Sequence, residues 1–107
     1  MTIEQTLLRD IEESQKELNG PNDDTTHRRD HSKRIELINW VLENMKKPDI
    51  QICDLIESKM NEIILKINQT HDIFEADKLH SELRILDWIF YQVCSYEIKN
   101  FEGLPNK

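Results

Sequence analysis

The sequence predicts an all-α protein, an up-down-up-down four-helix bundle made of two similar αα-hairpins. Three observations lead to this fold class. The 107 residues include only two Gly and three Pro, so long stretches lack the residues that interrupt helices. Apolar residues recur at the three- and four-residue spacing of a single helix face. A segment around Trp40 also resembles, position by position, a segment around Trp88.

The resemblance between the two tryptophan segments predicts an internal repeat. Residues 34–45 align with residues 82–93, and Trp is the only identity among the twelve positions. Eight other positions are close substitutions, such as Ile35 with Leu83. A repeat of this length indicates two copies of one supersecondary unit. The alternative is that any two amphipathic helices align on a Trp, and the four-helix prediction does not depend on the choice.

The first hairpin is predicted to span about residues 2–47. Thr2 and Gln5 have the spacing of a capping box, which starts the first helix. Asn19-Gly-Pro21 ends that helix, and Gly20 is expected to adopt the left-handed cap conformation. The second helix then starts between Asp24 and Asp30 and runs to Lys47, so a short polar link joins two antiparallel helices.

The second hairpin is predicted to span about residues 49–101, with Asp49 as the N-cap of its first helix. No Gly or Pro separates the third helix from the fourth, but the repeat places a link at residues 67–72. Asp72 and Glu75 have the spacing of an Asp-led capping box that starts the fourth helix. Residues 102–107 are expected to form a frayed tail. One domain should cover residues 1–107, because so short a chain cannot bury two independent cores.

Composition predicts a soluble protein of the cytoplasm. No apolar run approaches the roughly 18 residues that span a bilayer, and the N-terminus lacks the pattern of a signal peptide.

If the third and fourth helices pair about a turn near residue 70, Cys94 lies about 10 Å out of register with Cys53. That separation is beyond the reach of a disulfide, so both thiols are expected to be reduced and half-buried.

Charge argues against direct nucleic-acid binding. The net charge is −7, and it divides as −5 over residues 1–24, +3 over residues 25–47 and −5 over residues 48–107. Acidic flanks around one basic stretch create an overall field that repels phosphate. The expected partner is therefore another protein or a second copy of the chain, with no membrane and no cofactor involved.

Both tryptophan-bearing helices are apolar over more than one core-facing stripe. On a helical wheel, Leu37 and Trp40 fall outside the main apolar arc of the second helix, and Ile85 and Trp88 are displaced in the same sense on the fourth. One interpretation is that these helices form the central pair of the bundle and need wide apolar faces. The other is an exposed docking patch, because Trp is enriched at binding hot spots. Its predicted residues are Arg29, Lys33, Leu37, Trp40, Ile85, Trp88 and Tyr91, with the two bases as a rim.

A polar cluster at one end of the bundle is a candidate metal site. Asp24, His27 and His31 share one face of the second helix, and Glu75 would meet them if the second and fourth helices run parallel. Imidazoles with carboxylates suit a divalent transition metal. The alternative interpretation assigns Asp24 and Glu75 to helix caps and leaves both histidines solvated, so no metal is the main prediction.

The sequence favours a small non-enzymatic protein-interaction module, a regulator, inhibitor or adaptor that acts by occlusion or bridging. Its size and composition are typical of proteins of bacterial or phage origin. A metal-binding bundle is the alternative. An all-α magnesium-dependent nucleotide hydrolase is a weaker one, because the acids at positions 82 and 87 do not share a helix face. No phosphate-binding loop or nucleophile motif is present in the sequence.

Overall fold

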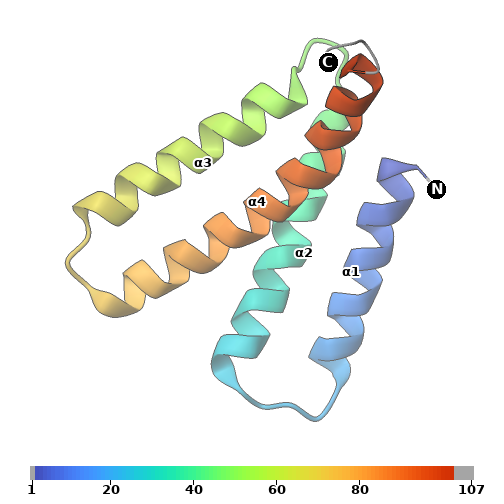
Figure 1. Cartoon of the computed structure of the whole chain (residues 1–107). Helices are drawn as coiled ribbons and strands as arrows, with labels where there is room; N and C mark the ends of the chain where they lie inside the picture. Colours follow the sequence, from blue (N-terminus) through green and yellow to red (C-terminus); the bar gives the residue numbers. More distant parts are fainter. Residues whose placement is uncertain (1, 103–107) are drawn as a thin grey trace.

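Four α-helices form two antiparallel hairpins that pack together as a bundle in the computed structural model (Figure 1). Their bounds are α1 (Ile3–Asn19), α2 (Thr25–Met45), α3 (Ile52–Gln69) and α4 (Ile73–Glu102). The structure describes residues 2–102 and, of the side chains, those of residues 2–94. The predicted fold class is confirmed, and no strand occurs within residues 2–102. Glu102 is the last residue of α4, and the rest of the predicted tail lies outside the described residues.

Three predicted helix starts are confirmed by their capping hydrogen bonds. Thr2 and Gln5 exchange bonds of 3.0 and 3.1 Å between side chain and backbone, which completes the capping box of α1. The Asp24 carboxylate accepts from the backbone N–H groups of Thr26 and His27 at the start of α2. At the start of α4 the Asp72 carboxylate accepts from the backbone N–H of residue 74 at 2.9 Å. Each bond satisfies a backbone donor that the helix itself leaves unpaired.

Two predictions about helix ends are wrong, each for a local reason. Gly20 is extended, with φ −81° and ψ −178°, because the residue before a proline is excluded from helical conformations and Pro21 follows it. Asp49 does not cap α3, which begins after Gln51 without a side-chain cap. The backbone N–H of Ile50 instead donates to the Lys47 carbonyl at 3.3 Å, so the chain first makes a turn.

The core lies where α2 and α4 face each other, with α1 and α3 on the outside (Figure 1). Ile38, Val41, Leu86 and Ile89 are fully buried there. Eleven of the buried residues among those described lie on α2 and α4, whereas the outer helices contribute four: Leu7 and Ser14 from α1, and Ile56 and Ile63 from α3. α2 and α4 are therefore the central pair, which explains why their apolar faces are wider than one stripe.

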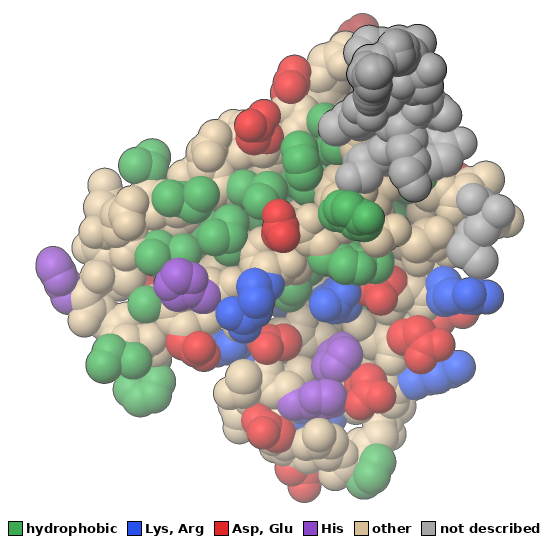
Figure 2. Space-filling view, viewed as in Figure 1, with side chains coloured by type: hydrophobic (Ala, Val, Ile, Leu, Met, Phe, Trp, Pro, Cys, Tyr) green, Lys and Arg blue, Asp and Glu red, His purple; other side chains and the backbone are tan. Residues whose placement is uncertain are grey.

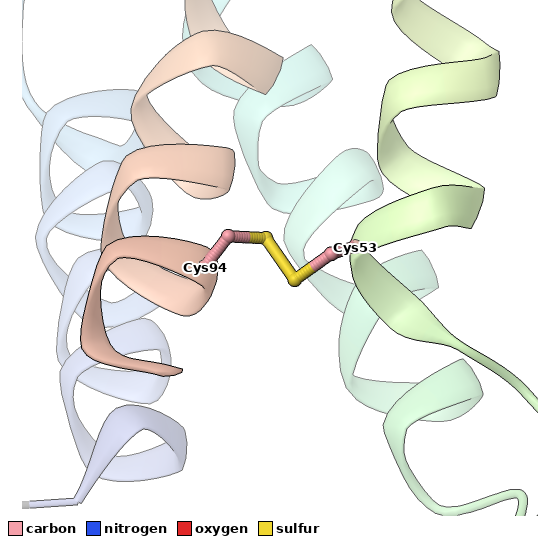
Figure 3. The surroundings of a disulfide bond; sticks show 2 residues. All are labelled: Cys53 and Cys94. Atoms are coloured by element: carbon pink, nitrogen blue, oxygen red, sulfur yellow. A yellow bond between two sulfur atoms is a disulfide. The ribbon is translucent and has the colours of Figure 1, made fainter. Parts of the chain in front are cut away.

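A disulfide joins Cys53 in the first turn of α3 to Cys94 in α4 (Figure 3). Their Cα atoms are 5.9 Å apart, so the predicted register, which kept the two thiols apart, is wrong. That register assumed that residues pair symmetrically about the turn. Instead α4 is displaced along α3, and Ile73 and Phe74 in its first turn are 80% and 84% exposed. The displacement brings Cys94 level with Cys53.

Opening the disulfide should destabilise the protein. The bond spans 41 residues, and in the chain-entropy model a closed loop of that length contributes about 4 kcal/mol by restricting the unfolded chain. We expect the free energy of unfolding to fall by about this amount when a reductant is present, as measured by urea denaturation with circular dichroism.

Cys53→Ser is the matched control for the reductant. It cannot form the bond, so its unfolding curve should be the same with and without reductant and should coincide with that of the reduced wild type. Equal stability of the oxidised and reduced wild type would show that the bond contributes nothing.

Candidate functional sites

The predicted docking patch does not exist as one surface. Leu37 and Ile85 are 4% and 5% exposed and belong to the core, so they cannot contact a partner. Trp40 and Trp88 are half-buried and pack against that core. Tyr91 is 65% exposed and is the predicted apolar residue that remains on the surface. The wheel pattern could not separate these cases, because a central helix and a docking helix both need wide apolar faces.

The two tryptophans occupy separate clefts, each about 500 Å³ in volume, that share no lining residue. Trp88 lies in a cleft formed along α4, with Arg84, Asp87, Phe90 and Tyr91. The cleft around Trp40 lies on α2 and has a more polar lining: Glu36, Asn39, Leu42, Glu43 and Lys46. The Trp88 cleft therefore combines three aromatic side chains with one charge of each sign.

A cation covers each tryptophan ring. The Arg34 guanidinium carbon is 5.3 Å from the ring centroid of Trp88, and the Lys59 ammonium is 5.6 Å from that of Trp40. Such cation–π contacts contribute about 0.5–1 kcal/mol at exposed sites. Arg34 also forms an ion pair of 2.9 Å with Asp10. These contacts fix the orientation of both indoles from neighbouring helices.

The two bases of the predicted rim form ion pairs with acidic residues of the same chain. Arg29 bonds to Asp30 and Asp77, and Lys33 lies 3.2 Å from Glu36 and 3.8 Å from Glu82. Burial lowers the pKa of Arg29, but hydrogen bonds and charge from the two aspartates outweigh it and raise that pKa overall. Both bases therefore tie α2 to α4 through acidic residues that sequence reasoning did not pair with them.

Ser81 is a polar contact between α2 and α4 that the sequence analysis missed. It is 4% exposed, and its hydroxyl accepts hydrogen bonds of 3.1 Å from both Arg29 and Arg84. Two guanidinium groups thus meet at one buried oxygen, beside a cleft of about 350 Å³ that Ser81 and Arg84 line with His27, His31 and Arg34. The signal available in the sequence was the position of Ser81 one helical turn before Ile85, on the same side of α4.

The candidate metal residues are only partly brought together. His27 and His31 face each other with ring centroids 4.5 Å apart. Asp24 caps α2, as the alternative interpretation required, and Glu75 lies on the exposed first turn of α4. The prediction that these acids would join the histidines is wrong, because α2 and α4 diverge toward their link segments (Figure 1).

Glu17 of α1 takes the place of those acids beside the histidines. Its Oε1 is 3.1 Å from Nε2 of His27, and Nδ1 of His31 is 3.0 Å from the hydroxyl oxygen of Ser14. Burial lowers the pKa of His31, and the neighbouring His27 lowers it further. The sequence analysis missed Glu17 and Ser14, whose spacing on one face of α1 was the available signal.

Comparison with known proteins gives no further guide to the function, since no family model, no curated protein and no solved structure matches this chain. Within the described residues, no helix is long and apolar enough to cross a membrane. The candidate sites therefore depend on the geometry of this chain alone.

Substitutions at Ile85 and Tyr91 should separate core from surface. Ile85→Ala removes buried methyl groups and should cost about 2–5 kcal/mol of unfolding free energy. Tyr91→Ala should change stability by less than about 0.5 kcal/mol, because its side chain is mostly in water. Urea denaturation of both variants measures this difference, and comparable losses would place Tyr91 in the core.

Proposed function

We propose that this protein is a small non-enzymatic protein-interaction module that regulates, inhibits or links its partner by occluding or bridging it. The observation that carries the proposal is the uneven distribution of exposed apolar side chains. Of the six large hydrophobic residues that are exposed among the described ones, five lie on the second hairpin: Ile64, Leu65, Ile73, Phe74 and Tyr91. In the view of Figure 2, most of the visible hydrophobic side chains lie over α3 and α4.

We place the main contact with the partner in the Trp88 cleft, whose lining includes Tyr91, one of those five exposed residues. Tyr91 and Trp88 present large rings with few torsions to freeze, which is why such residues dominate binding energy at interfaces. Arg34 already fixes the Trp88 ring, so part of the ordering cost is met before a partner binds. Arg84 and Asp87 at the edge of the cleft supply one charge of each sign, which orients a partner more than it adds affinity.

A non-catalytic role is supported by the environment of the most enzyme-like pair of side chains. The Ser14 hydroxyl contacts a ring nitrogen of His31, the arrangement that activates a serine nucleophile. Ser14 is only 1% exposed, however, so a substrate cannot reach it. In the proposed non-catalytic protein, Ser14 orients the His31 imidazole and performs no chemistry of its own.

We also propose a cytoplasmic location, and the disulfide must be considered because its redox state depends on the compartment. Reducing systems in the cytosol keep most thiols unpaired, and disulfides persist mainly in oxidising compartments. In the cytoplasm the Cys53–Cys94 pair would therefore be open. The proposed surface around Trp88 lies on a single helix, so its lining does not depend on that bond.

Tyr91→Asp should weaken partner binding at least about 30-fold, which corresponds to the 2 kcal/mol typical of a hot-spot residue. A charge in the lining of the Trp88 cleft loses the aromatic contact and must be desolvated when the partner binds. The measurement is affinity capture from a lysate of the source organism, followed by titration of the recovered partner against wild-type and variant proteins.

Leu8→Asp is the matched control, because Leu8 is 47% exposed but lies on α1. It should bind as well as the wild type. Equal losses in the two variants, or a partner that tolerates Tyr91→Asp, would contradict the proposal. Sedimentation analysis of the same proteins distinguishes a second copy of the chain from a different partner.

A further inference from the structure

We propose that Glu17, His27 and His31 form a zinc site that clamps the end of α1 to the start of α2. Among the described residues this is the one set of three possible ligands whose donor atoms all lie within 4.8 Å of one another. The inference is independent of the Trp88 surface, which lies on another helix.

The spacing of the donor atoms fits tetrahedral coordination. Zinc binds imidazole nitrogen and carboxylate oxygen at about 2.0–2.1 Å, which places two ligand atoms about 3.3 Å apart. Nε2 of His27 and Oε1 of Glu17 are already 3.1 Å apart. The Glu17 side chain is 55% exposed, so it can adjust its position at little cost. His27 and His31 are four residues apart on α2, which directs both rings to the same face.

Ser14 supports a metal-binding role of His31 because it holds the imidazole through the ring nitrogen that does not bind the metal. A metal-bound histidine usually donates its second ring N–H to a hydrogen-bond acceptor, and this bond orients the ring. Nδ1 of His31 is 3.0 Å from the hydroxyl oxygen of the buried Ser14. Because Nδ1 contacts Ser14, the proposed site uses Nε2 of His31 as its ligand atom. The pair thus supplies both a ligand and the group that positions it.

The choice of zinc follows from the donor types and the neighbouring charges. Two imidazoles and one carboxylate suit zinc and its neighbours in the transition series, whereas magnesium and calcium prefer oxygen ligands alone. Arg34 is the arginine whose charge acts on His31, and its ion pair with Asp10 reduces its repulsion of the ion. Three protein ligands leave a fourth position for water.

Calorimetric titration of zinc into tag-free, chelator-treated protein under non-reducing conditions tests the site. We expect one zinc per chain, and zinc at about 100 times its Kd should raise Tm by about 10 °C. Cobalt(II) in place of zinc should give the intense visible absorption of a tetrahedral ion. No heat of binding at submillimolar zinc, or one ion for every two chains, would overturn the proposal.

The variants test the two histidine ligands and the serine that positions one of them. His31→Gln and His27→Gln should each weaken zinc binding at least about 10-fold, and Ser14→Ala should weaken it about 10-fold without loss of helicity. His80→Gln is the matched control, since His80 is exposed on α4 and distant from the cluster in sequence. It should bind zinc like the wild type. A loss in His80→Gln as large as that in His31→Gln would show that zinc binds elsewhere.

Discussion

The contact between α2 and α4 is the constraint on which the rest of the structure depends. Each hairpin has one inner helix, and neither inner helix can hide its wide apolar face without the other. Ile38 and Val41 of α2 are fully buried, as are Leu86 and Ile89 of α4. Burying such side chains is worth about 1.5–3 kcal/mol each, more than any of the surface ion pairs contributes. The outer helices then cover the remaining sides of this pair.

Polar contacts set how the two inner helices are aligned, which apolar packing alone specifies poorly. The Arg29 guanidinium bonds to Ser81 and Asp77 across the α2–α4 boundary, and Arg84 reaches the same hydroxyl of Ser81. A buried hydroxyl that lost these donors would remain unsatisfied, at a cost of about 1–3 kcal/mol. A slip of one helix along the other is therefore penalised. These contacts engage Arg29, and Lys33 pairs with Glu36 and Glu82, so both bases that the sequence predicted as a rim for a partner bond within the chain.

The sequence predicted the fold because its signals are local, and it failed where two helices had to be placed relative to each other. Capping by Thr2, Asp24 and Asp72 depends on residues within one turn, so spacing was sufficient. Whether Leu37 faces a partner or the core depends on which helix is central, and no local pattern encodes that. The Cys53–Cys94 pair was missed for the same reason, since a displacement of α4 along α3 decides it. His27 and His31 were found together because they share a helix, whereas Glu17 comes from another one.

The helices of the two hairpins are joined by different contacts: a disulfide in the second hairpin and the Glu17–His27 contact in the first. The two contacts differ in how much they can stabilise the fold. The disulfide joins residues 41 positions apart, far from the α3–α4 link, so it removes much conformational freedom from the unfolded chain. Glu17 and His27 are 10 positions apart and flank the α1–α2 link, so a bridge between them closes only a short loop. A metal there would gain less from loop entropy and would depend on the energy of its ligand bonds. That energy is available only when the ion is bound, so the first hairpin would respond to metal supply and the second to redox conditions. Because α2 and α4 share one core, either response would be transmitted to the stability of the whole bundle.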